Sequence, residues 1–286
     1  MLAIIAGSAG DQVMPEFDVD PASFASRDTP FGPTSPLAVG SVAGESTVIV
    51  ARHGLDGYSV AAPFVNYRAN VFALKERSVT EVIAWSGPGA IDAGVSIGQY
   101  VIPDDVLDET RRPRTFYEGT GLGVIRVTPV FCPRVSAALI AGCEAMQTPP
   151  RVGGTYVCTE GPRLETPAEI CKYAMLGGHF VGMTLCPEVF LARELEICYS
   201  AILYVTNYAE GVKATPDQPG RLFGGLMSPD EENAQREAVR VLPRVIEQAV
   251  GQRHGVSEEC SCQRSMERYR RSGRIGDDWR QWMRLA

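Results

Sequence analysis

Glu165 and Asn207 are the residues best suited to hold an uncharged nitrogen heterocycle. Glu165 lies in the run CTEGPRLETPAE (residues 158–169), and Asn207 directly follows the apolar run AILYVT. A carboxylate accepts hydrogen bonds from ring N–H groups, and an amide offers both a donor and an acceptor to adjacent edge atoms of a base. On spacing alone, a loop with solvated acids explains the first run equally well, and an Asn after a strand is most often a turn former.

Three turns rich in small residues can hold an anion such as phosphate. IIAGSAG places Ser8 after one apolar run, VARHG places Arg52 and His53 after a second, and WSGPGAID places Ser86 and Gly87 after a third. Backbone N–H groups, hydroxyls and the guanidinium fork all suit phosphate oxygens. A plain turn also explains the first motif, and a salt-bridged Arg at a strand end explains the second. Together, however, the three turns favour a single phosphate site.

Short apolar runs alternate with helical patterns, which predicts an α/β fold with a sheet covered on both faces. In such sheets ligands collect where strands end, so these turns are expected to meet. Residues 63–77 are expected to form an amphipathic helix that buries Val65, Ala69, Phe72 and Leu74. Residues 230–250 have a helical pattern that Pro243 should kink or split. The predicted strands are the runs LAIIA, STVIVA, EVIAW, GTYVC and AILYVT.

Composition limits the class of partner. The 286-residue chain has a formal net charge of −7, which argues against broad binding to nucleic acid or to membrane surfaces. No run approaches the roughly 20 apolar residues that cross a bilayer, and the N-terminus lacks signal-peptide features, so we expect a cytoplasmic protein. We expect one domain over residues 1–250 and a C-terminal tail over 251–286. This tail is rich in Arg and carries Trp279 and Trp282. It predicts a solvated, partly ordered segment, with a partner-binding helix as the alternative.

The eight cysteines include no CxxC pair, so we expect no structural zinc site and no bound metal. GxGxxG and the Walker lysine are also missing after the first apolar run, which disfavours a dinucleotide or nucleoside triphosphate ligand. The motif CSC leaves three interpretations open for Cys260 and Cys262: a strained redox pair, a metal-catching hook, or two free thiols. The remaining six lie among apolar neighbours and are expected to be buried, inert thiols: Cys132, Cys143, Cys158, Cys171, Cys186 and Cys198.

Several motifs taken together resemble the trimeric nucleoside phosphorylases, a family that contains methylthioadenosine phosphorylases and 6-oxopurine nucleoside phosphorylases. The resemblance runs from residue 1 to about 212, and more faintly to about 250, and rests on TPFGPTS, ARHG, VNYRAN, EGPRLETPAE, GMTLCPEVFLARE and ICYS. It implies a central mixed sheet forming a distorted barrel flanked by helices. It also implies a homotrimer or dimer of trimers, with active sites near subunit boundaries. Inorganic phosphate is then a co-substrate, and no cofactor is expected.

The resemblance also implies roles for individual residues. Met183 matches the residue beneath the ribose, and Leu164, Glu165 and Asn207 match residues that line the base. Adenine-preferring members carry Ser near position 165 and Asp at positions 207 and 209, whereas this chain has Glu165, Asn207 and Ala209. The positions that match the phosphate site are Ser8, Arg52, His53, Ser86, Gly87 and Thr184.

These residues lead to three hypotheses. The favoured one is phosphorolysis of inosine, guanosine or 5′-methylthioinosine to free base and (5-methylthio)ribose 1-phosphate, in purine salvage. The second is S-methyl-5′-thioadenosine phosphorylase activity, in methionine salvage. The third is a nucleoside-binding relative that has lost turnover.

The chain departs from the family pattern at several points. The His expected soon after ARHG is missing, and Tyr58 lies in that stretch instead, while Pro88 replaces a small residue. Cys132 and Cys198 match positions that are bridged in archaeal relatives, although intracellular thiols are normally reduced unless the source is thermophilic. An apolar 5′ pocket or ordinary helix packing would explain a last group, Leu222, Phe223, Leu226 and Met227.

Overall fold

Parallel strands buried on both faces form the centre of the molecule. The structure, a computed structural model, describes residues 1–213, 220, 222, 227–257 and 259–283. Every residue of β1 (Leu2–Ala6) and of β13 (Cys198–Tyr204) is buried. These continuously buried runs, rich in Ile, Leu and Ala, do not alternate between core and solvent, so they require helices on both sides.

The largest sheet has seven strands and is mixed. Its centre is parallel, whereas β4 runs antiparallel to β5, and β8 runs antiparallel to β13. Across the sheet the order is β10 (Arg151–Val152), β8 (Tyr100–Ile102), β13, β6 (Glu81–Ser86), β1, β5 (Glu45–Ala51) and β4 (Leu37–Val42).

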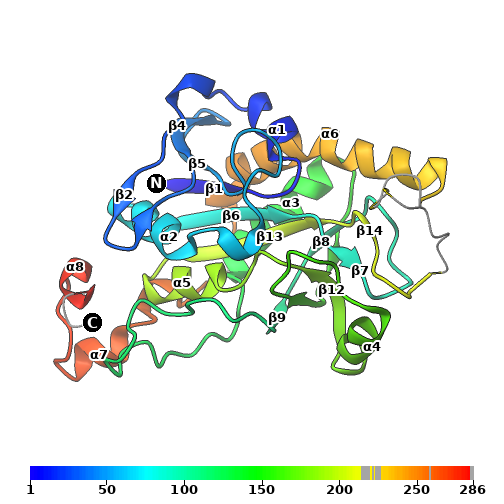
Figure 1. The fold of residues 1–286 in the computed structure, drawn as a ribbon. Helices are drawn as coiled ribbons and strands as arrows, with labels where there is room; N and C mark the ends of the chain where they lie inside the picture. The colour runs from blue at the N-terminus through cyan, green and yellow to red at the C-terminus, as the bar shows by residue number, and fades with distance from the viewer. Residues whose placement is uncertain (214–219, 221, 223–226, 258, 284–286) are drawn as a thin grey trace.

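Alternate residues of the central strands enter two separate apolar layers. Ile5 and its equivalents pack with α2 (Tyr67–Glu76) and α5 (Glu188–Glu194). Ile4 and its equivalents pack with α3 (Pro133–Ala145) and α6 (Pro229–Gln252). Figure 1 shows the two pairs of helices on opposite faces of the sheet.

A second, five-stranded sheet continues from the first because the chain passes from the large sheet into the small one four times. The crossings run from β6 to β7, from β8 to β9, from β10 to β11 and from β13 to β14. The α/β class, the mixed sheet and the flanking helices are thus confirmed. The two larger sheets are linked by these crossings, and the expected distorted barrel stays a prediction. The second sheet has the order β14 (Asn207–Tyr208), β7 (Gly89–Ala90), β12 (Gly178–Gly182), β11 (Thr155–Cys158) and β9 (Asp105–Asp108).

The helix over residues 63–77 is confirmed as α2, which begins at Tyr67 because the Asn66 side chain accepts a hydrogen bond from Ala69 N. The expected split at Pro243 is wrong. Helix α6 passes through Pro243 without a break, since a capping box at Ser228 starts it and apolar residues around Pro243 are buried. That burial offsets a proline cost of about 3 kcal/mol. The smaller elements are α1 (Gly10–Val13), α4 (Pro167–Met175), β2 (Asp28–Thr29), β3 (Gly32–Pro33), α7 (Glu267–Arg271) and α8 (Trp279–Trp282).

The prediction of a solvated tail is wrong for residues 259–283. Met266 and Trp282 are 0% and 1% exposed and belong to the main core. Met266 N donates to Glu196 Oε1 at 3.1 Å, and the Trp279 ring packs edge-on against Phe72 at 5.4 Å. Apolar residues spaced among the arginines therefore dock this segment near α2 and α5, as Figure 1 shows.

Cys171 lies exposed on α4, so the expectation that it is buried is wrong, because the apolar face of this short helix is formed by Ile170 and Tyr173. Within the described part of the chain, none of the helices has the length and apolar character needed to span a membrane.

Candidate active site

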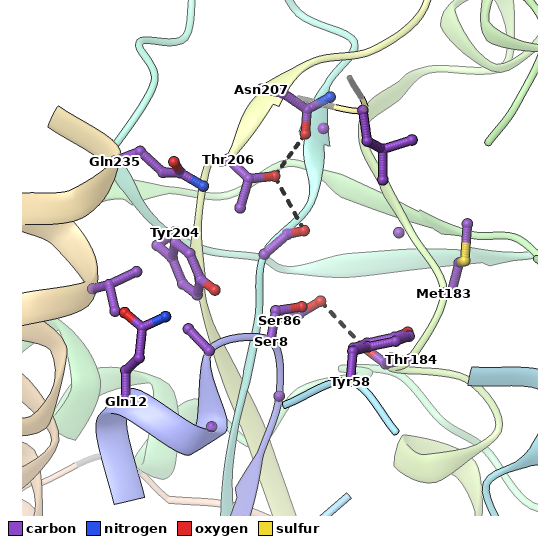
Figure 2. A pocket seen from close by; sticks show the side chains of 18 of the residues that line it. Ser8, Gln12, Tyr58, Ser86, Met183, Thr184, Tyr204, Thr206, Asn207 and Gln235 are labelled. Atoms are coloured by element: carbon purple, nitrogen blue, oxygen red, sulfur yellow. Dashed lines mark hydrogen bonds between the residues drawn. The ribbon is translucent and has the colours of Figure 1, made fainter. Parts of the chain in front are cut away.

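A cavity of about 900 Å³ opens where strands cross from the large sheet to the small one. It is bordered by the ends of β1, β6 and β13 and by the segments after β11 and β12 (Figure 2). The fold thus brings together residues that the sequence separates by up to 200 positions. The predicted site residues that line this cavity are Ser8, Ser86, Gly87, Leu164, Glu165, Met183, Thr184, Asn207 and Ala209.

Hydroxyl groups gather at one end of the cavity. Ser86 Oγ lies 3.1 Å from Thr184 Oγ1 and 3.2 Å from the Tyr156 hydroxyl. Tyr156 is fully buried behind them and accepts a hydrogen bond from Thr184 N at 3.3 Å. This end of the cavity therefore offers several hydroxyls to an oxyanion. Sequence analysis recognised the strand that carries Tyr156 but missed the residue.

The turn after β1 approaches the sheet too closely for a side chain at Gly7. A Cβ there would lie 2.1 Å from the Trp85 carbonyl oxygen and 2.8 Å from Arg52 Nη2. The Trp85 indole N–H also donates to the Ser8 carbonyl at 2.9 Å. These contacts hold Ser8 at the cavity wall.

Arg52 lies behind the cavity wall and outside the cavity itself. It is fully buried, and its Nη1 donates to Glu188 Oε1 at 2.8 Å, while Nη2 donates to the Trp85 carbonyl at 2.8 Å. Burial alone would lower the pKa of Arg52, but the Glu188 carboxylate raises it overall. The structure therefore shows the salt-bridged Arg at a strand end, whose charge lies directly behind the first turn.

His53 is also separated from the cavity. Its Nδ1 lies 2.8 Å from the Val60 carbonyl and must carry the proton, because a carbonyl only accepts. Its Nε2 is buried and has no hydrogen-bond partner among the described residues. The Tyr58 ring stacks on the imidazole at 4.0 Å and itself lines the cavity, so it covers His53. Burial, followed by the Arg52 charge, lowers the pKa of His53 to about 3, which keeps the ring neutral.

The run CTEGPRLETPAE forms another part of the cavity wall through Pro162, Leu164 and Glu165. Glu165 is buried and lines the cavity, where it accepts a hydrogen bond from Thr159 Oγ1. Glu169 forms a capping box with Thr166 at the start of α4, and its carboxylate pairs with Arg163. Glu165 therefore faces the cavity, and Glu169 stabilises the start of α4.

A buried arginine that sequence analysis missed holds this part of the wall together. Arg112 Nη2 donates to the Glu160 carbonyl at 2.6 Å, and Nη1 donates to the Met183 carbonyl at 2.6 Å. Gly161 adopts φ +70°, and a Cβ there would lie 2.4 Å from Met183 Sδ. The segment before Glu165 and the segment that carries Met183 are thus packed directly against each other.

The orientation of the Asn207 amide is set by its neighbours. Thr206 Oγ1 donates to Asn207 Oδ1 at 2.7 Å, and Nδ2 donates to the Tyr208 carbonyl at 2.8 Å (Figure 2). If the amide oxygen and nitrogen were exchanged, two acceptors, Asn207 Oδ1 and the Tyr208 carbonyl oxygen, would lie 2.8 Å apart. Nδ2 must therefore face Tyr208. The second N–H of this amide points away from the Tyr208 carbonyl and can donate to a ligand. Thr206 Oγ1 also lies 3.1 Å from the Pro88 carbonyl, which places the atypical Pro88 in contact with this pair.

Helix α6 contributes a polar wall that sequence analysis did not assign to the site. Gln235 lines the cavity together with Arg236, Arg240 and Arg244, which recur every fourth residue. Residues four apart lie on the same face of a helix, so the spacing of these arginines could have identified the wall from the sequence.

The residues for which an apolar 5′ pocket or ordinary helix packing was open differ in position. Leu222 lines the cavity, whereas Met227 packs against the main core. Phe223 and Leu226 lie outside the described residues.

Known proteins resemble this chain along most of its length. A sequence model described as Phosphorylase superfamily matches residues 2–250. The 6-oxopurine nucleoside phosphorylase of Pyrococcus furiosus is 42% identical over 219 residues, which cover 74% of this chain and 80% of the relative. The probable S-methyl-5′-thioinosine phosphorylase of Methanothermobacter thermautotrophicus is 43% identical over 185 residues, 64% of each chain.

A solved structure agrees with these relatives. The methylthioadenosine phosphorylase from an antarctic soil metagenomic library has a TM-score of 0.77 and 26% identity, covering 92% of this chain and 90% of that one. Sequence and fold therefore agree over the whole region that builds the cavity. This chain belongs to the phosphorylase superfamily.

Proposed function

We propose that this protein cleaves the N-glycosidic bond of 6-oxopurine nucleosides with inorganic phosphate. The observation that carries the proposal is that Glu165, Asn207 and the hydroxyls of Ser86 and Thr184 line one cavity. The acid and the amide have the hydrogen-bonding groups that suit the edge of a base, and the hydroxyls suit an oxyanion. The relatives named for 6-oxopurine and methylthioinosine phosphorylases support the same reaction.

In the proposed reaction, phosphate binds beside Ser8, Ser86 and Thr184 with the sugar above it. Breaking the glycosidic bond gives the sugar oxocarbenium character, which the phosphate anion stabilises and then traps at the anomeric carbon. The products are free base and ribose 1-phosphate, or its 5-methylthio analogue. Phosphate is the only co-substrate in this proposal, and no cofactor takes part.

The departing purine gains negative charge as the bond breaks. A donor aimed at that charge lowers the barrier, and one such hydrogen bond is worth roughly 2.7–4 kcal/mol. The free N–H of Asn207 is the proposed donor to O6 and N7, and the Glu165 carboxylate accepts from the ring N1–H. Adenine presents the opposite pattern, with an acceptor at N1 and a donor at its amino group. This contrast underlies the proposed preference for a 6-oxo base.

Arg52 and His53 act from behind the wall in this proposal. The Arg52 charge favours an anion at the adjacent turn, although its pairing with Glu188 reduces that effect. If Tyr58 moves aside, the unpartnered Nε2 of His53 can accept a hydrogen bond from the P–OH group of a phosphate monoanion.

Base release from four nucleosides tests the proposal. Inosine, guanosine, 5′-methylthioinosine and 5′-methylthioadenosine are incubated with and without phosphate, and free base is measured. We expect phosphate-dependent release from the 6-oxopurine nucleosides. Cleavage of methylthioadenosine alone would contradict the argument from Glu165 and Asn207. Binding without turnover of any substrate would show a nucleoside-binding protein.

We also propose that the chain assembles as a homotrimer or a dimer of trimers. Family resemblance supports this assembly, as does Phe64, whose side chain is 75% exposed shortly after the segment that carries Tyr58. Light scattering on the purified protein tests it, and a monomeric mass would contradict it.

A further inference from the structure

Four cysteines from three distant parts of the chain meet at one point. Cys132 immediately precedes α3, Cys198 begins β13, and Cys260 and Cys262 belong to the docked tail. Their four sulfur atoms all lie within 4.8 Å of one another. Cys132, Cys198 and Cys262 are buried, and Cys260 is half-buried at the rim. The CSC motif is therefore completed by two cysteines that sequence analysis had interpreted as inert.

The spacing of the sulfurs fits a shared ion. All four cysteines are free thiols, and Cys198 Sγ lies 3.6 Å from Cys260 Sγ. A disulfide would bring two sulfurs to about 2.05 Å. Sulfurs bound to one tetrahedral zinc at about 2.3 Å are about 3.8 Å apart, close to the observed separation.

The surroundings suit a cluster of thiolates. The backbone N–H of Val135, in the first turn of α3, donates to the Cys132 sulfur. Arg134 Nη2 lies 3.8 Å from Cys198 Sγ, and the Arg193 charge acts on Cys262. A zinc ion with four thiolates carries a net charge of −2, which the guanidinium groups of Arg134 and Arg193 reduce, although Arg134 also pairs with Glu81.

We propose that Cys132, Cys198, Cys260 and Cys262 form a structural zinc site that fastens the C-terminal segment to the sheet. On binding, four S–H groups release four protons, and four Zn–S bonds form without any change of oxidation state. All four positions are then occupied by protein, which is typical of a structural site and leaves none for substrate. This role selects the metal-catching interpretation of CSC over a redox pair or two free thiols.

The location of the site indicates what the ion stabilises. The tail segment after Cys262 supplies Met266 and Trp282 to the core, and α6 ends only a few residues before Cys260. Zinc at this point therefore ties both the tail and the C-terminal end of α6 to β13. The cavity lies at the other end of β13, so the ion supports stability and takes no part in catalysis.

Metal analysis of the full-length protein tests the site. The protein is purified under reducing conditions, dialysed against metal-free buffer and analysed by mass spectrometry for zinc. Thiols are then counted after denaturation in chelator. We expect one zinc ion per chain together with all eight thiols. Zinc-free protein with eight thiols would overturn the proposal, and so would a count lowered in pairs by disulfides.

Variants locate the ion. Cys260→Ser and Cys262→Ser are expected to lose the zinc, whereas Cys171→Ser, at an exposed position on α4, keeps it and serves as the matched control. Cobalt substitution gives a second readout, since four thiolates produce intense visible bands of tetrahedral Co²⁺. Zinc retained in both CSC variants would overturn the assignment. Base-release activity, measured in parallel near room temperature, separates failure of this proposal from failure of the proposed reaction.

Discussion

Replacing Asn207 with Asp should reverse the preference of the base site. In the structure, Asn207 Nδ2 donates to the Tyr208 carbonyl at 2.8 Å, and its second N–H is the donor proposed for the purine. A carboxylate oxygen cannot remain beside that carbonyl unless it takes a proton. A protonated Asp donates its only O–H to the Tyr208 carbonyl, and an ionised Asp that turns away from this carbonyl has no hydrogen to donate. The purine loses its donor in both states.

The size of the effect follows from this lost hydrogen bond. Removing one donor from a developing oxyanion costs roughly 2.7–4 kcal/mol, or about 10²–10³ in kcat. A 6-aminopurine, by contrast, gains an acceptor for its amino group. The ratio of kcat/KM for inosine over adenosine should therefore fall by at least about 10², towards the roughly 10⁴ that a misplaced polar partner can reach.

The assay is kcat/KM for inosine and adenosine at saturating phosphate, measured on the Asn207→Asp variant. Thr206→Val is the matched control, since it removes one hydrogen bond to Asn207 Oδ1 but leaves the amide in place. We expect this control to lose about 0.5–1.5 kcal/mol, roughly tenfold at most. An unchanged inosine-to-adenosine ratio in Asn207→Asp, or a loss no larger than that of the control, would refute the reasoning.

Three other perturbations test the supporting structure. The pKa of His53 lies at about 3 when folded and near 6.5 when unfolded, so the unfolded chain binds more protons between these values. Stability should therefore fall as pH drops from about 6.5, by up to roughly 1.4 kcal/mol per pH unit, in urea titrations. His53→Asn should flatten this slope, and an equal slope would contradict the assignment.

Glu188→Ala strands a buried guanidinium and should cost about 3–5 kcal/mol in thermal unfolding; a loss under about 1 kcal/mol would count against the ion pair. Gly161→Ala should cost about 1–3 kcal/mol and raise KM, because φ is +70° and its Cβ would meet Met183 Sδ at 2.4 Å. Gly273→Ala, at φ +68° with nothing within 4 Å, isolates the backbone cost, and equal KM values in the two variants would contradict the clash.

The strand ends were the most predictable part of the site. Continuous apolar runs identified β1, β5 and β6, and parallel neighbours necessarily end at the same edge, so Ser8 and Ser86 were expected to meet. Glu165 and Asn207 were selected because few side chains can recognise the edge of a base, and both line the cavity. For these residues the residue type and the position relative to a strand were sufficient to indicate the chemistry, and the sequence shows both.

The remaining features depend on partners that the sequence does not place nearby. Arg52 has the pattern of an anion ligand, and only the folded chain shows Glu188, 136 residues away, as its partner. The cysteine cluster escaped prediction for the same reason, since its two halves carry no recognisable spacing. In the tail, Met266 and Trp282 are too widely spaced among arginines to indicate burial.

The cavity has two kinds of wall, which differ in how well they should tolerate substitutions, because the chain passes from the large sheet into the small one beside it. Its base includes Gly87, which follows β6 of the large sheet, and Gly89, which begins β7 of the small sheet. A Cβ at Gly87 would lie 2.6 Å from Thr206 Cγ2, so an exchange there disturbs the packing between the segments that link the two sheets. The other wall comes from α6 and from the segment around Tyr58, which lie outside both sheets. Substitutions on the wall from α6 and the Tyr58 segment can therefore change the shape of the cavity without altering the strand ends that carry Ser86 and Asn207.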